Sequence, residues 1–334
     1  MVAVFQVILV HLSYVLFFKE ELFSPNWVAA NFYDSLSRMG VPLFFMVSGY
    51  LLLGKSEPIS DFFRKRFWKV GIPTLFWSVA YLLWSVEAYR NGTMSPLSVV
   101  LSMLKAIYLG NVEIHLWFLY ILIGIYLAVP ILRVFVSAAS RRDLTYFVIL
   151  WFVATPLFEL AQRMLGLQTA LVIPVVTGYV GYFMLGYLLA ELQLDRRGRA
   201  LCMAGIILAV TSTFLGTNLL SSQAGFLDTY FYSYFSLPTV LATLCGFFLL
   251  KDLGQRLGKA GGLVRTLSAT SFGIYLIHIF VVELLRKGIL GLRLYGWMGP
   301  SAYMIPLTAL GVFLLSFVFV FVLRKIPILK MLVP

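Results

Sequence analysis

The chain has 334 residues and three histidines, and each histidine lies in or at the edge of a long apolar run. His11 follows Val-Ile-Leu-Val, His115 begins the run His-Leu-Trp-Phe-Leu-Tyr, and His278 ends a run that starts at Ser271. Imidazole is neutral at ordinary pH and accepts a proton readily, which suits a general base acting on a hydroxyl. The sequence therefore predicts proton-transfer chemistry, with His11 and His278 as the candidate catalytic residues.

Helical spacing groups polar residues around two of these histidines. Ser271, Tyr275 and His278 are four and three residues apart, so on a helix they form one polar stripe, whose members are candidates to donate to an oxyanion. His11 and Tyr14 share a helical face in the same way. The alternative interpretation is that each histidine bridges two helices by hydrogen bonds.

His115 and Trp117 allow two interpretations. They are candidates for a supporting role on the acceptor side, and they also fit the aromatic belt found at the ends of membrane spans. A metal site is not expected, because three histidines without a Cys, Asp or Glu cluster do not reproduce the ligand spacing of zinc sites. The two cysteines, Cys202 and Cys245, lie in apolar runs and are interpreted as small buried hydrophobic residues.

Positive charge is concentrated at 64–69, where four basic side chains precede an apolar run. Guanidinium groups bind phosphate through two parallel hydrogen bonds, so Arg64, Arg66 and Lys69 are predicted to hold the phosphates of a coenzyme A thioester. Charge that only fixes membrane topology, or contact with anionic lipid headgroups, would also explain the cluster. Arg38 stands where little else is charged, and it either holds an anionic or sugar acceptor or extends its head to water.

The composition places these residues in a bilayer. Hydrophobic residues make up 61% of the chain and charged residues 12%, whereas a soluble domain typically has about 45–50% and about 25%. A chain with so few charges must hide nearly its whole surface from water, and a lipid bilayer does this.

The apolar residues fall into segments of the length that a spanning helix requires, about 20 residues. Since the connections are short, the longest being 87–114, the sequence predicts an all-α bundle of ten spans that forms a single domain over 1–334. The predicted spans run near 1–18, 37–54, 68–86, 115–136, 144–162, 171–190, 200–219, 230–250, 270–289 and 301–323.

The basic residues predict the orientation of this bundle. If both termini are cytoplasmic, 18 of the 26 Lys and Arg residues fall in or beside cytoplasmic connections, as the positive-inside rule requires. Arg286, Lys287 and Arg293 go against the bias. The net charge of +12 is thereby explained by topology, and nucleic acid is not expected as a partner.

Four stretches together resemble the acyltransferase 3 family of bacterial integral-membrane acyltransferases. They are the run from Val41 through Ser48-Gly-Tyr, the basic run ending at Pro73, the run that begins at His115, and Ser271 to His278. They occur in the family's order, and the resemblance covers essentially the whole chain. It implies a multi-pass protein of the bacterial inner membrane that uses cytoplasmic acyl-CoA.

The family usually transfers acetyl from acetyl-CoA, a donor substrate, to a sugar hydroxyl of a surface polysaccharide or its lipid-linked precursor, while other members modify other acceptors. The resemblance therefore implies an O-acetyltransferase of polysaccharide biosynthesis. Its implied partners are acyl-CoA, a glycan or lipid-linked glycan acceptor, and membrane lipids, with no metal cofactor.

Carried over residue by residue, the family's first-span histidine matches His11, and its basic pair before the third-span proline matches Arg66 and Lys69. The family more often has arginine at both positions, and lysine keeps the charge but loses the two-pronged donor. The family also has a basic residue eleven positions before its histidine, which here falls before Met1. Either the start of the chain is truncated or this member does without that cation.

Two rival functions remain open. A transporter of polysaccharide or small solutes would use the same histidines as proton relays, but the sequence has no two-half repeat. It also has few acids to pair with the histidines, since Glu159 and Glu283 are the only candidates and Glu283 does not share a helical face with His278. The second rival is a catalytically inactive relative with a scaffolding role.

Overall fold

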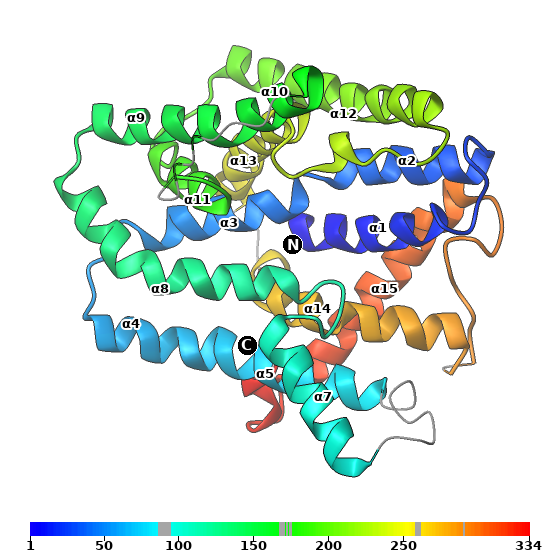
Figure 1. Cartoon of the computed structure of the whole chain (residues 1–334). Helices are drawn as coiled ribbons and strands as arrows, with labels where there is room; N and C mark the ends of the chain where they lie inside the picture. Colours follow the sequence, from blue (N-terminus) through cyan, green and yellow to red (C-terminus); the bar gives the residue numbers. More distant parts are fainter. Residues whose placement is uncertain (86–94, 167–170, 172, 174–175, 258–261, 290) are drawn as a thin grey trace. The chain divides into compact units, whose positions relative to one another are not determined.

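The computed structural model describes residues 1–85, 95–166, 171, 173, 176–257, 262–289 and 291–334, and every element within these ranges is helical (Figure 1). The chain divides into two compact units. The first comprises Met1–Lys55, Ile131–Thr266 and Leu294–Gly311, and the second comprises Ser56–Pro130, Leu267–Arg293 and Val312–Pro334. Three helices belong partly to each unit: α8 (Trp117–Ala138), α14 (Gly262–Lys287) and α15 (Ser301–Leu323).

The first unit is a layered set of helices in which α1 packs on α2 and α3, α3 packs on α11 and α13, and α12 packs on α13 and α2. Figure 1 shows α1 and α2 lying side by side. The elements of this unit are α1 (Val2–Leu16), α2 (Pro25–Ser37), α3 (Gly40–Leu52), α9 (Arg141–Phe152), η2 (Val153–Leu157), α10 (Phe158–Leu165), α11 (Tyr179–Leu188), α12 (Arg196–Ala224), η3 (Tyr230–Tyr232) and α13 (Leu237–Leu257).

Two glycines let α3 and α11 cross with their backbones in contact. A Cβ atom added to Gly49 would lie 1.8 Å from the carbonyl oxygen of Phe183, and one added to Gly186 would lie 2.0 Å from the carbonyl oxygen of Met46. Small residues are what membrane helices use to approach this closely. The glycine in the Ser-Gly-Tyr run is therefore explained by packing.

The second unit is built around α5, which continues from α4 and η1 without a break. The η1 segment is a turn of π-helix just before Pro73, a residue that cannot donate a backbone hydrogen bond. Single turns of π-helix occur frequently at functional sites. The elements wholly in this unit are α4 (Ile59–Arg66), η1 (Phe67–Gly71), α5 (Ile72–Trp84), α7 (Pro96–Leu109) and η4 (Leu329–Met331).

Seven helices among the described residues are long and apolar enough to cross a membrane. They confirm the all-helical class and a multi-pass membrane protein. These helices are Pro25–Leu52, Trp117–Ala138, Arg141–Leu165, Arg196–Ala224, Tyr230–Leu257, Arg265–Lys287 and Ser301–Leu323.

The count of ten spans, the orientation of the termini and the single domain remain predictions. In three predicted spans the α-helix is short: α1 has 15 residues, α5 has 13 and α11 has 10. Residue 86 of the third predicted span and residues 172 and 174–175 of the sixth lie outside the described residues.

The segment between the first two predicted spans forms a helix, whereas the sequence predicts only a connection there. Ser24 caps the N-terminus of helix α2, since its hydroxyl oxygen accepts from the Trp27 N–H at 3.2 Å, and Pro25 is the first residue of the helix. The sequence does not predict this helix from its apolar residues, because too many of its residues are polar. They are buried and bind one another, as the Arg38 network described below shows.

Candidate functional site

The second unit brings two of the three histidines together. His278, on α14, is fully buried, and His115, just before α8, is 1% exposed. Their ring centroids are 4.8 Å apart and the rings meet edge to face at 73°. The sequence singled out both residues, but only the fold makes them a pair.

The neighbouring backbone fixes the tautomer of His278. Its Nδ1 lies 2.6 Å from the carbonyl oxygen of Tyr275. A carbonyl can only accept a hydrogen bond, so Nδ1 carries the proton and donates it to this oxygen. In the neutral ring the lone pair is then on Nε2, which is the state that a general base requires.

The hydroxyls of the α14 stripe are bound to backbone carbonyls. The Tyr275 hydroxyl donates to the carbonyl oxygen of His115, and its ring lies 5.5 Å from the His115 imidazole. The Ser271 hydroxyl donates to the Leu267 carbonyl at 2.8 Å, one turn earlier on the same helix. Donation to an oxyanion stays a prediction for both, and it would require each proton to leave its present carbonyl.

Tyr81 on α5 joins this cluster and was not identified from the sequence. Its hydroxyl donates to the Leu276 carbonyl at 2.9 Å and accepts from the Phe280 N–H at 3.3 Å. These two groups are four residues apart and pair with each other in a regular helix. The Tyr81 hydroxyl therefore bridges the turn of α14 that carries His278, while its ring contacts His115 at 5.2 Å.

A sequence signal for Tyr81 existed. Thr74, Ser78 and Tyr81 have the same spacing of four and three as the polar stripe on α14, and all three are buried. A polar stripe on an otherwise apolar helix indicates the face that packs inside the protein. Tyrosine is common at membrane interfaces, so this stripe did not stand out.

The basic cluster lies at the other end of α5 from the histidine pair. The side chain of Arg64 is 73% exposed and lies 3.6 Å from Asp61, and Lys69 is exposed in η1. Lys65 is bound by Glu57 at 2.6 Å. From Lys69 to Tyr81 the helix rises about 18 Å at 1.5 Å per residue. A donor bound at the cluster must extend along α5 to bring its acyl group to the histidines.

Arg66 differs from its basic neighbours because it is half-buried against aromatic rings. Its guanidinium lies 5.3 Å from the centroid of Phe62 and 5.6 Å from that of Tyr126, within cation–π range. Its Nε is buried, and no residue in the described part of the chain forms a hydrogen bond with it. An oxygen-bearing ligand would satisfy this donor.

His11 belongs to the first unit, whereas the histidine pair belongs to the second. It is half-buried on α1, where it follows the fully buried Val4 and Ile8 around the same side of the helix. Its role as a catalytic residue stays a prediction. Ser48, also in the first unit, is half-buried on α3 next to the close crossing at Gly49.

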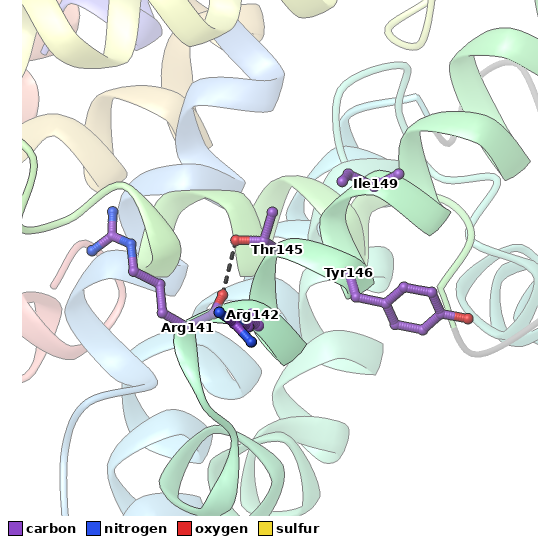
Figure 2. A pocket seen from close by; sticks show the side chains of 5 residues that line it. All are labelled: Arg141, Arg142, Thr145, Tyr146 and Ile149. Atoms are coloured by element: carbon purple, nitrogen blue, oxygen red, sulfur yellow. Dashed lines mark hydrogen bonds between the residues drawn. The ribbon is translucent and has the colours of Figure 1, made fainter.

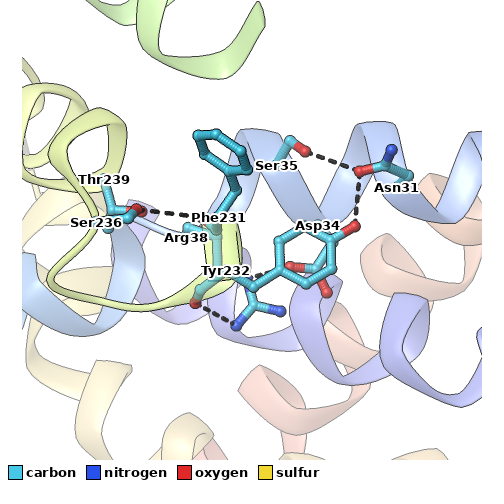
Figure 3. Close-up of polar contacts among 8 residues, drawn as sticks. All are labelled: Asn31, Asp34, Ser35, Arg38, Phe231, Tyr232, Ser236 and Thr239. Carbon is cyan, nitrogen blue, oxygen red and sulfur yellow. Dashed lines mark hydrogen bonds and ion pairs between the residues drawn. The ribbon is translucent and has the colours of Figure 1, made fainter. Parts of the chain in front are cut away.

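Arg38 is buried in the first unit and paired with Asp34, so it does not extend to water (Figure 3). Its side chain is 11% exposed and that of Asp34 is not exposed. Arg38 also donates to the Tyr232 carbonyl at 3.1 Å, and its guanidinium lies 4.3 Å from the Tyr232 ring centroid. The Tyr232 hydroxyl donates to Asn31 at 2.6 Å, and so does the Ser35 hydroxyl at 3.1 Å. Binding an acceptor at Arg38 stays a prediction.

A surface recess of about 430 Å³ opens at the start of α9 (Figure 2). Two cations and two exposed apolar or aromatic side chains surround it, a combination that suits anionic lipid headgroups at the membrane surface. Its lining residues are Arg141, Arg142, Thr145, Tyr146 and Ile149.

A second recess, of about 400 Å³, is lined by residues that flank His115 in the sequence, between α7 and α8. Glu113 lies in it, and burial raises the pKa of this carboxyl, with Glu283 nearby raising it further and the Ile114 N–H lowering it. Trp117, at the first turn of α8, also lines it and is half-buried. Among the described residues, no group of three or more His, Cys, Asp or Glu side chains is placed to hold a metal ion.

The acyltransferase 3 family, described as an acyltransferase domain, matches residues 1–325, nearly the whole chain. No curated protein and no solved structure matches.

Proposed function

The chain belongs to the acyltransferase 3 family, and on that premise we propose that this membrane acyltransferase is an O-acetyltransferase of the bacterial inner membrane. Its donor is cytoplasmic acetyl-CoA, and its acceptor is a sugar hydroxyl of a cell-envelope polysaccharide or of its lipid-linked precursor. The observation that supports the chemistry best is the buried pair His115–His278, with the lone pair of His278 on Nε2.

In this proposal the basic cluster holds the donor. Arg64 and Lys69 are exposed and bind the phosphates of coenzyme A as accessible cations, and Arg66 offers its buried Nε. Lys69 lies in the turn of π-helix just before α5, and Arg64 and Arg66 lie in the last turn of α4. The thioester arm then lies along α5 towards Tyr81 and the histidines.

The transfer step follows from the tautomer. Nε2 of His278 accepts the proton of the acceptor hydroxyl while that oxygen attacks the thioester carbonyl, and base catalysis of this kind contributes about 10²–10⁴-fold in rate. A new C–O ester bond forms and the C–S bond breaks. The imidazolium then returns its proton to the coenzyme A thiolate. Tyr275 and Tyr81 hold His115 and the α14 turn in position.

His11 is the second catalytic candidate, because it matches the family's first-span histidine. We propose that it is required for transfer either as a base or at the donor. Variants that lack one histidine at a time separate its contribution from that of His278.

The test is transfer of labelled acetyl from acetyl-CoA to glycan in membranes that contain the protein. Wild-type membranes should incorporate label, and His11→Ala membranes should not, although equal amounts of protein are inserted. Mass spectrometry of envelope glycans with and without the gene should show a difference of one acetyl group. A transporter would show no dependence on acetyl-CoA, and that result would overturn the proposal.

A further inference from the structure

The recess between α7 and α8 is lined by the segment that leads into His115. Its volume of about 400 Å³ falls within the range of small-molecule sites, about 300–1,000 Å³. Both units of the structure contain buried polar clusters, but this recess combines open volume with side chains that recognise a ligand. The lining residues are Gly110, Asn111, Val112, Glu113, Ile114 and Trp117.

Three of these side chains have the chemistry that recognises a sugar ring. The indole of Trp117 offers an apolar face on which the C–H face of a pyranose packs. Glu113 accepts hydrogen bonds from hydroxyls, and Asn111 both donates and accepts them. Among the residues that the structure describes, no basic side chain lines the recess and one acidic side chain, Glu113, does, so the charge of this lining disfavours an anionic sugar.

The segment is held in place at both ends. Gly110 ends α7 with φ of +71°, and the Leu116 N–H donates to the Glu113 carbonyl at 3.0 Å. The Tyr275 hydroxyl binds the carbonyl of His115. His115 is buried against His278, while its neighbour Ile114 is 50% exposed. One short, anchored segment therefore has the recess on one side and the proposed base on the other.

We propose that this recess is the acceptor subsite and that it binds a neutral hexopyranose, stacked on Trp117 and hydrogen-bonded by Glu113 and Asn111. The assignment of the recess to the acceptor rests on the proposed acetyltransferase function. It extends that function by naming the site and the charge class of the acceptor.

The test is direct binding of simple glycosides to the full chain in lipid nanodiscs, by saturation-transfer NMR. The probes are methyl α-D-glucoside, methyl β-D-galactoside, methyl α-L-rhamnoside and methyl α-D-glucuronide. At least one neutral glycoside should bind the wild type, and about tenfold more tightly than the anionic glucuronide. Trp117→Ala should weaken that binding about tenfold and Trp117→Tyr less than threefold, where tenfold corresponds to about 1.4 kcal/mol.

The matched control is Tyr108→Ala, because Tyr108 is an aromatic residue of the adjacent helix α7 that is 87% exposed and does not line the recess. Its glycoside binding should equal that of the wild type. The comparison of neutral with anionic glycoside uses the wild type alone, so it holds even if a Trp117 variant fails to fold.

Two results would overturn the assignment: no neutral glycoside binds the wild type, or Trp117→Ala and Glu113→Gln bind as the wild type does. Acetyl transfer from acetyl-CoA by the wild type is measured separately. If glycoside binding depends on Trp117 but no acetyl is transferred, the recess is a sugar site and the acetyltransferase proposal fails.

Discussion

At the scale of single residues, Glu113 makes stability depend on pH. Burial raises the pKa of its carboxyl above the ordinary value of 4.5. As pH rises past 4.5, this group ionises freely in the unfolded chain but resists ionisation in the folded one, so the unfolded state binds fewer protons and stability falls. The loss is complete above the raised pKa.

The prediction concerns Glu113→Gln, which keeps an oxygen to accept from the Ile114 N–H, as Glu113 does at 3.1 Å. Thermal midpoints of the detergent-purified wild type and variant should agree near pH 4, and the wild type should fall below the variant as the pH approaches 8. If the thermal midpoints of the two proteins differ by the same amount at every pH in this range, the raised pKa does not belong to Glu113.

Tyr81 allows a second test at the residue scale. Tyr81→Phe removes only the hydroxyl that bridges Leu276 and Phe280. The loss of this buried hydrogen-bonding group should cost about 0.5–1.5 kcal/mol of stability, and kcat should fall because the His278 turn is no longer held. Tyr303→Phe, at a tyrosine that is 57% exposed, is the control and should alter neither quantity. An unchanged kcat in Tyr81→Phe would remove it from the positioning of His278.

The sequence identified individual residues better than their partners. The histidines stood out because imidazole is rare in apolar runs, but the contact between His115 and His278 depends on tertiary packing of α14 against the start of α8. Arg38 stands out in the sequence because little else near it is charged. Its partner Asp34 lies four residues earlier on the same helical face, but the length of the apolar runs assigns that segment to a connection, where no helical face is expected.

At the scale of elements, a substitution at the crossing of α3 and α11 tests whether close packing explains the glycine at position 49. Gly49→Ala would place a Cβ atom 1.8 Å from the Phe183 carbonyl oxygen, whereas an added Cβ at Gly124 on α8 meets nothing within 4 Å. Overpacking of this kind costs about 1–3 kcal/mol or more. Gly49→Ala should therefore lower the thermal midpoint by several degrees, and Gly124→Ala should not lower it, because alanine is favoured over glycine inside a helix. Equal midpoints for the two variants would contradict the packing explanation.

The boundaries of the elements were predictable where apolar length alone decides them. The last predicted span, 301–323, coincides with α15, whose residues are apolar almost throughout. Helix α2 was missed because its polar residues are satisfied inside the fold, which no periodicity of apolar residues shows. The turns of π-helix at Phe67–Gly71 and Val153–Leu157 have a proline in or near them, but proline alone does not distinguish a π-turn from a kink.

At the scale of the whole molecule, the positive-inside rule predicts that the connection at 55 is cytoplasmic and that the recess at 110–117 opens on the opposite face. This is tested with single cysteines in a chain that carries Cys202→Ala and Cys245→Ala. A membrane-impermeant maleimide applied outside spheroplasts should label Asn111→Cys, and it should label Lys55→Cys only after the membrane is permeabilised. Labelling of both positions from the same side would contradict the orientation.

The central claim is that His278 is the base of acetyl transfer, and kcat for acetyl transfer from acetyl-CoA in nanodiscs tests it most directly. His278→Ala should lower kcat by about 10²–10⁴-fold with the protein inserted at the wild-type level. Tyr303→Phe, at a tyrosine that is 57% exposed, should stay within about threefold. A His278→Ala protein that transfers acetyl at the wild-type rate would contradict the claim.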